Sequence, residues 1–456
     1  MQETKARISR FLELITSERF FYGMIMTVMI SLPITEIFDE LHSNRFTSQP
    51  VIIEMAGYLG VFSIFTHFLK HKGIKIYLSD LLFFAMLIIS ILSAVFTQNK
   101  EATFGGFYYD ELLSSFFGYF SLMFAGTMIE DSKLRKNLLK AFVFVTLIQT
   151  SAAALQTVGI YNIEAFYDSV ITMERKRSYG LLQHSNWYGG LSVLLFACTS
   201  GIYLFTKSKA TRNIMYAISM LCFYTLLSAE ARLAWVGTAG YLFFLVVSLI
   251  VMKRKGYDKD KLRSVTKRLA LLAVGMAAVI AFVIIVCGKI VDKIQMTSNE
   301  ISSHNARSVG SNRGYIWKYG LESVPKYWPL GIGLDNYRDV FYLDPDHEPP
   351  LTQGKGHNEY IHYLVTQGAF QLIAYLTLLI HGAVTGVRTV IHAEKDEDRI
   401  IEWILLGMFF GYTTQALFNS SVVNVAPYFW ITLGMCLTKK HQRWLGYKKE
   451  KKAKKA

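Results

Sequence analysis

The feature that most constrains this chain is a series of long apolar runs without charge. Residues 81–95, 191–205 and 269–286 contain no Asp, Glu, Lys or Arg. Because an α-helix rises about 1.5 Å per residue, roughly 20 apolar residues cross the hydrocarbon core of a bilayer. Runs of this kind recur along the chain, which predicts an all-α, polytopic membrane protein.

About twelve transmembrane helices are predicted from the lengths and spacing of these runs. They cover residues 20–37, 51–69, 81–96, 112–128, 138–158, 188–205, 214–227, 233–251, 269–288, 359–387, 401–418 and 425–437. No repeat of fixed period and no linker rich in Pro, Gly or Ser divides the chain. We therefore expect a single membrane domain over residues 1–456.

The positions of Lys and Arg predict how the helices are oriented, because cytoplasmic loops carry an excess of these residues. With the N-terminus inside, most of the 48 Lys and Arg residues fall on the cytoplasmic side. This orientation puts both termini in the cytoplasm. It also makes residues 289–358 an extracytoplasmic loop, the longest polar segment between two apolar runs, and we expect that loop to carry part of an active site.

The net charge of +14 does not indicate a nucleic-acid-binding protein. Lys and Arg lie in short loops between apolar runs and not on one soluble face. Their densest cluster, residues 448–455, is typical of a cytoplasmic end that lies against anionic lipid, with a phosphate-binding arm as the alternative. The four cysteines (Cys198, Cys222, Cys287 and Cys436) have no metal-ligand spacing, so we expect neither a disulfide framework nor a metal.

Arg232 stands at the start of an apolar run with almost no loop around it. An arginine at mid-bilayer costs about 2.5–3.5 kcal/mol on insertion scales, so such residues usually face a polar cavity or a partner. One interpretation is an interface arginine, alone or paired with Glu230. The other is a contact with an anionic group, since the guanidinium fork bonds phosphate oxygens in pairs and stays charged.

Four short motifs follow one another in the second half of the chain. They are Leu227-Ser228 with Arg232 and Trp235, Arg313 with Trp317, Pro329-Leu330-Gly331-Ile332-Gly333, and His357-Asn358 with Gly368. Their order resembles the O-antigen ligase and O-antigen polymerase superfamily. Arg177-Ser178-Tyr179-Gly180 with Asn186 also resembles a segment of that family, whereas the first five predicted helices match it only as generic helices. Glu230 and Gln371 depart from the family pattern, in which a small or hydroxyl residue and a second glycine are usual.

The resemblance implies a helical glycosyltransferase of the GT-C type in the bacterial cytoplasmic membrane. Such enzymes move a glycan from undecaprenyl diphosphate to an acceptor, a glycan or a lipid-linked glycan, on the outer face. By position, Arg232 and Arg313 would bind the diphosphate, with Arg177 as a further candidate, and His357 would be the catalytic residue at the acceptor. The supporting residues would be Asn358, Trp317, Glu230 and Asn186.

The chemistry is consistent on its own terms. ATP and nucleotide sugars are absent outside the cytoplasm, so the donor must arrive already activated, and a diphosphate is a good leaving group. Arginines directed at its oxygens would stabilise the developing charge without a metal or another cofactor. His357 would accept the proton of the acceptor hydroxyl, a role worth about 10²–10⁴-fold, or it is a helix-start histidine bonded to backbone. A single base opposite the leaving group predicts inversion of configuration.

Ligases and polymerases share these motifs, and the acceptor separates them. In this chain the single largest outer loop precedes the last three predicted helices, an arrangement that resembles the ligases more than the polymerases. A transporter of polysaccharide or lipid-linked oligosaccharide is the alternative from another class, but it would bury charges along a path through the membrane. Residues 313–328 are predicted to form a helix at the membrane interface.

Overall fold

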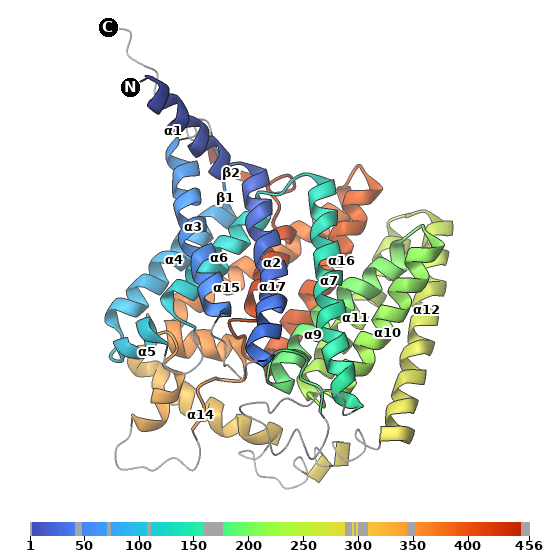
Figure 1. Ribbon diagram of the computed structural model, residues 1–456. Coiled ribbons are helices and arrows are strands. Elements are labelled where there is room, and N and C mark those ends of the chain that lie inside the picture. Colours follow the sequence, from blue (N-terminus) through green and yellow to red (C-terminus); the bar gives the residue numbers. More distant parts are fainter. Residues whose placement is uncertain are drawn as a thin grey trace.

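In a computed structural model, most of the chain is helical (Figure 1). The structure describes residues 2–41, 48–70, 74–106, 111–158, 177–287, 294–295, 298–299, 309–343 and 352–447. The α-helices are α1 (Gln2–Ile15), α2 (Glu18–Leu41), α3 (Gln49–Lys70), α4 (Leu78–Phe96), α5 (Lys100–Gly105), α6 (Leu113–Thr127), α7 (Ser132–Thr157), α9 (Ser185–Phe205), α10 (Lys209–Ser228), α11 (Arg232–Arg254), α12 (Lys259–Phe282), α14 (Val309–Tyr327), α15 (Glu359–His392), α16 (Asp396–Gln415) and α17 (Ala426–Cys436). The remaining elements are η1 (Val283–Cys287), η2 (Tyr337–Tyr342), η3 (Ala416–Phe418) and the strands β1 (Lys75–Tyr77) and β2 (Trp444–Tyr447).

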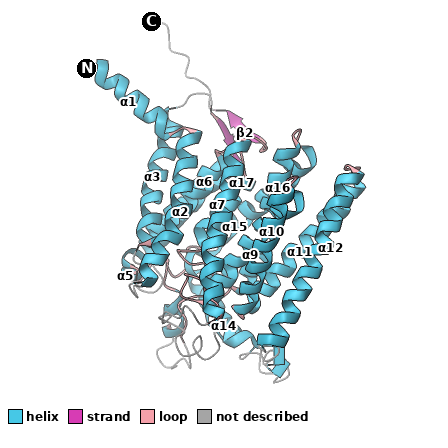
Figure 2. Cartoon of the chain, turned by 45° about the vertical axis from the view of Figure 1, so that its right-hand side comes forward, coloured by secondary structure: helices cyan, strands magenta, loops and turns pink. Residues whose placement is uncertain are grey.

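The long helices cross between two ends of one bundle (Figures 1 and 2). One end carries α1 and a small sheet in which β1 pairs antiparallel with β2; we call it the terminal face. The other end carries α5 and α14, and we call it the loop face. Successive helices run in opposite directions, so the turns that precede α9, α11 and α15 all lie at the loop face.

The predicted fold class is confirmed. Within the described residues, nine helices are long and apolar enough to cross a membrane: α2, α3, α4, α7, α9, α11, α12 with η1, α15, and α16 with η3. The other three predicted helices also form, as α6, α10 and α17. With 15 and 11 residues, α6 and α17 are shorter than the roughly 20 residues that span a bilayer core.

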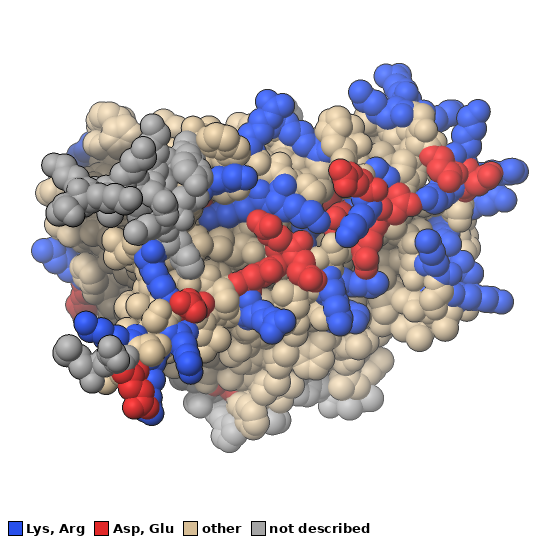
Figure 3. All heavy atoms as spheres, turned by 90° about the horizontal axis from the view of Figure 1, so that it is seen from above, with Lys and Arg blue, Asp and Glu red and all other residues tan. Residues whose placement is uncertain are grey.

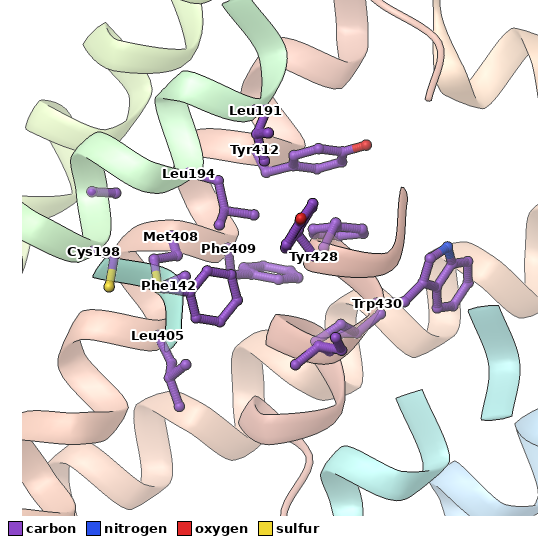
Figure 4. Close-up of a cluster of buried hydrophobic side chains, with 14 of the residues drawn as sticks. Phe142, Leu191, Leu194, Cys198, Leu405, Met408, Phe409, Tyr412, Tyr428 and Trp430 are labelled. Atoms are coloured by element: carbon purple, nitrogen blue, oxygen red, sulfur yellow. The ribbon is translucent and has the colours of Figure 1, made fainter. Parts of the chain in front are cut away.

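Helix α9 lies at the centre of the bundle and is buried along nearly its whole length. A close-up shows its side chains meeting those of α7, α16 and α17 in one apolar cluster (Figure 4). Small residues allow the backbones to approach. A Cβ on Gly189 of α9 would lie only 2.7 Å from the Cβ of Ala231, at the start of α11. Such close contacts are how helices associate in lipid, where water does not drive them together.

Buried ion pairs connect the elements of the terminal face. Arg135 of α7 bonds Glu402 of α16 at 2.6 Å, and both side chains are buried. Lys439, which precedes β2, pairs with Asp80 of α4 at 2.9 Å. Seen from above, this face carries many Lys and Arg side chains (Figure 3).

At the loop face, α14 lies across the end of the bundle (Figure 1). It confirms the helix predicted over residues 313–328, although it begins earlier and ends at Tyr327. Tyr315 and Ile316 of α14 pack on Tyr337 and Phe341 of η2, forming a small second core. This core attaches α14 to the start of α15, through Val365.

Helix α15 is broken at Gly368, where φ is +83°. The turn Pro329–Gly333 docks into the break: the N–H of Ile332 donates to the carbonyl of Val365, and that of Ala369 donates to the carbonyl of Trp328. A Cβ on Gly368 would lie 2.3 Å from the carbonyl oxygen of Pro329. The prediction of a continuous helix over residues 359–387 missed this break. The turn bonds backbone groups that the break leaves without helical partners, as membrane depth requires.

Candidate functional site

The predicted site residues lie on four separate segments of the loop face. Arg177 precedes α9, Arg232 is the first residue of α11, Arg313 lies in α14, and His357 lies just before α15. More than half of the predicted loop at residues 289–358 falls within the described residues, including all of its predicted site residues. The site can therefore be built from these segments upward.

Arg177 contacts the turn that leads to Arg232. Its Nε donates to the carbonyl of Ala229 at 3.1 Å, and the N–H of Ser178 donates to the carbonyl of Ser228 at 3.0 Å. Glu230, in the same turn, is buried and has a φ of +52°, a conformation unusual for a residue with a side chain. Two of the three predicted arginine segments are thus held together by main-chain contacts.

The start of α9 joins this pair to the rest of the site. The Nδ1 of His184 accepts the N–H of Asn186 at 3.1 Å and caps the helix, while its ring lies 4.8 Å from the ring of Trp187. The carbonyl of Asn186 accepts from Asn419 at 3.5 Å. These bonds involve only the main chain of Asn186. His184 was not among the predicted site residues, although it lies two residues before Asn186.

His357 lies near two cations and a second imidazole. Its pKa is lowered to about 3, first by burial of the imidazole and then by electrostatic interaction with Arg313, His184 and Lys355. The ring is therefore neutral at neutral pH. Its φ of +47° places its backbone in the left-handed region, where residues with side chains are uncommon. Strained backbone of this kind clusters at functional sites, where surrounding structure must hold it.

The turn around His357 is held on both sides. Trp317 Nε1 donates to the carbonyl of Gly356 at 2.8 Å. The side chain of Asn358 caps α15 by accepting the N–H groups of Tyr360 and Ile361. The two predicted supporting residues next to His357 thus each bond the backbone on one side of it.

A buried ion pair next to His357 was not predicted. Lys355 bonds Glu111, the residue two positions before α6, and both side chains are buried. Tyr119 of α6 donates to the other carboxylate oxygen of Glu111 at 3.3 Å. Nothing in the order of residues indicates this pair, because its members lie far apart in the chain. The one sequence signal for this pair was the position of Glu111, an acidic residue at the edge of an apolar run.

The structure thus brings Arg313, His184, Lys355 and His357 into one electrostatic neighbourhood. The segments of Arg177 and Arg232 form the second part of the site, and His184, the residue before α9, belongs to the first. Within the described residues, no group of three or more His, Cys, Asp or Glu side chains could hold a metal ion. The arrangement supplies positive charge and one neutral imidazole, which suits an anionic ligand beside a proton acceptor.

The chain was compared with curated proteins and with models of protein families. No curated protein matches the chain. Residues 217–376 match the model of the O-antigen ligase family. This match runs from α10 into α15, so it contains Arg232, Arg313 and His357 but neither Arg177 nor Glu111. Residues 217–376 are therefore similar to the O-antigen ligase family, and this match supports the resemblance to the O-antigen ligase and polymerase superfamily.

Proposed function

We propose that this protein transfers a glycan from undecaprenyl diphosphate to an acceptor sugar on the outer face of a bacterial cytoplasmic membrane, as a glycosyltransferase of the GT-C type. The observation that carries the proposal is the proximity of Arg313 to His357 at the loop face, beside the Arg177 and Arg232 segments. The donor supplies the diphosphate as leaving group. The arginines recognise that group, and His357 serves the acceptor.

The orientation of the chain supports this reading. Lys and Arg side chains are numerous on the terminal face, which by the positive-inside rule is cytoplasmic (Figure 3). The loop face is then extracytoplasmic, where lipid-linked glycans arrive already activated. The single membrane domain and the loop at residues 289–358 fit the same orientation.

Arg232 and Arg313 bind the diphosphate oxygens, and Arg177 contributes from the neighbouring turn. Guanidinium groups fixed in place stabilise the charge that develops as the glycosidic bond breaks, so a metal is not required. His357 takes the proton from the acceptor hydroxyl as it attacks the anomeric carbon. Attack opposite the leaving group inverts the configuration at that carbon.

The lowered pKa of His357 fits this sequence of events. The imidazole is a weak base because it is buried and because Arg313, His184 and Lys355 further disfavour its protonated form. A bound diphosphate brings negative charge, which offsets these cations and raises the pKa of His357. The base would then gain strength only when the donor is present.

Among members of this superfamily, a ligase is favoured because the long outer segment precedes the last three crossing helices. A polymerase of lipid-linked repeat units is the second candidate, since it would use the same donor chemistry. A transporter is disfavoured, because the site cations gather at one face and do not follow a path through the bundle.

The test is transfer by purified protein in nanodiscs, supplied with a glycan on undecaprenyl diphosphate and candidate acceptors. Arg232→Ala and His357→Ala should each lower the rate at least 100-fold, on the scale of losing a charge-stabilising donor or a general base (about 10²–10³). Arg263→Ala and His392→Ala are matched controls, because the first is exposed on α12 and the second is exposed at the end of α15, both at the terminal face. Movement of the donor across a liposome without covalent transfer would contradict the proposal and favour the transporter.

A further inference from the structure

The ion pair between Lys355 and Glu111 has no assigned role, yet it lies directly beside the candidate base. Lys355 is two residues before His357, and its charge is one of those that lower the pKa of His357. Glu111 lies two positions before α6, in the first half of the chain and outside residues 217–376. The pair therefore joins an early segment of the chain to the turn that holds His357.

The pair is embedded in a larger polar network. Glu359, the first residue of α15, lies within electrostatic reach of both Glu111 and Lys355. Its carboxylate accepts the hydroxyl of Tyr375 at 2.6 Å and that of Tyr412 at 3.3 Å. Lys355 therefore has two carboxylates in its neighbourhood, and aromatic hydroxyls hold both of them in place.

Stability alone is a poor explanation for this arrangement. Moving two charges out of water is unfavourable. Replacing a buried ion pair by apolar residues of similar volume often leaves the stability of a fold unchanged or increases it. The location of the pair is more informative. Through the single residue Gly356, it fixes the backbone next to a histidine that holds a left-handed conformation.

We propose that Glu111 and Lys355 are positioning residues that hold the Lys355-Gly356-His357 turn and set the direction and charge surroundings of the His357 imidazole. This inference rests on the proposed role of His357 as the base. It makes the start of α6 a part of the active site. The charged groups near His357 are then Arg313 from α14 and Lys355, which Glu111 neutralises, and the other titratable groups near it are His184 at the start of α9 and His362 in α15.

The first measurement needs no substrate. Diethyl pyrocarbonate modifies neutral imidazoles, and the modification rate of His357 at pH 7 can be followed by peptide mass spectrometry in nanodiscs. Glu111→Gln should raise this rate several-fold, because the turn loses its ion pair and is held less rigidly. The exchange Glu111→Lys with Lys355→Glu should return it to the wild-type rate by restoring an ion pair.

The second measurement is transfer as a function of pH. Glu111→Gln should lower kcat about 10- to 100-fold with little change in the KM for the donor, as expected for a displaced catalytic group. In the exchanged pair a carboxylate replaces the cation next to His357, which raises the pKa of the imidazole. The acid limb of kcat should therefore move to higher pH by about one unit.

Asp80→Asn is the matched control, because it breaks the other buried lysine–carboxylate pair, with Lys439 at the terminal face. It should lower the unfolding temperature without changing either the modification rate of His357 or the acid limb. Should the exchanged pair fail to fold, Glu111→Leu with Lys355→Met replaces it, and we expect this variant to fold with His357 modified faster than in the wild type.

The inference is overturned if Glu111→Gln leaves the modification rate of His357 at the wild-type value, or if Asp80→Asn changes that rate equally. An unmoved acid limb in the exchanged pair would overturn it as well. A wild-type protein that transfers no glycan would contradict the proposed function, while the modification rates would still decide whether the pair positions His357.

Discussion

At the scale of single residues, the site depends on side chains whose properties come from their neighbours. A histidine before a helix is ordinary in a sequence, and its low pKa follows first from burial of the imidazole and then from Arg313, His184 and Lys355. His184 and Lys355 were not predicted. His184 comes from a distant segment of the chain, and the buried position of Lys355 depends on its pair with the equally distant Glu111.

The pH dependence of transfer tests this neighbourhood. The pKa of His357 is lowered, so its neutral form persists as the pH falls below 6.5 and is lost only near about 3. The ratio kcat/KM reports the free enzyme, so it should stay level between pH 8 and pH 5. The value of kcat reports the enzyme with donor bound, so its decline at low pH, the acid limb, should occur at a higher pH than that of kcat/KM. An acid limb near pH 6.5 in kcat/KM would contradict a depressed pKa.

At the scale of elements, hydropathy predicted the helices and missed their irregularities. Each of the twelve apolar runs forms a helix, because any segment that apolar must satisfy its backbone internally within a membrane. The break at Gly368 was not predicted, since a glycine within an apolar run is common in membrane helices. Its partner is the turn at Pro329–Gly333, so the two sequence motifs are the two halves of one backbone contact.

Gly368→Ala tests that contact. A Cβ would lie 2.3 Å from the carbonyl oxygen of Pro329, and φ is +83°, so both space and conformation oppose a side chain. We expect a loss of about 1–3 kcal/mol in stability, together with reduced transfer because the start of α15 shifts. Gly23→Ala in α2 is the control, because nothing lies within 4 Å of its Cβ position. Thermal unfolding in detergent compares the two, and an equal effect would rule out a special role for Gly368.

At the scale of the whole molecule, the positions of the basic residues predict which face is cytoplasmic. Cys198, Cys222 and Cys436 are buried, so new cysteines can be labelled against a low background once Cys287 is replaced by serine. Lys100 is exposed at the loop face and Lys209 is exposed at the terminal face. These two positions report on opposite sides of the membrane.

Labelling of intact spheroplasts with a membrane-impermeant maleimide should modify Lys100→Cys and spare Lys209→Cys. Inverted membrane vesicles should give the reverse pattern, because the positive-inside rule puts the terminal face in the cytoplasm. Labelling of Lys209→Cys in spheroplasts would place the candidate site on the wrong side for a lipid-linked glycan donor.

The pairing of β1 with β2 has a consequence for how the protein is made. Strand β1 is synthesised at Lys75–Tyr77, and its partner at Trp444–Tyr447 follows all the described helices in the chain. The edge of β1 therefore has no partner while those helices enter the lipid. The sheet can form only after synthesis has passed Tyr447, and a product truncated before Trp444 would lack it however many helices it had inserted.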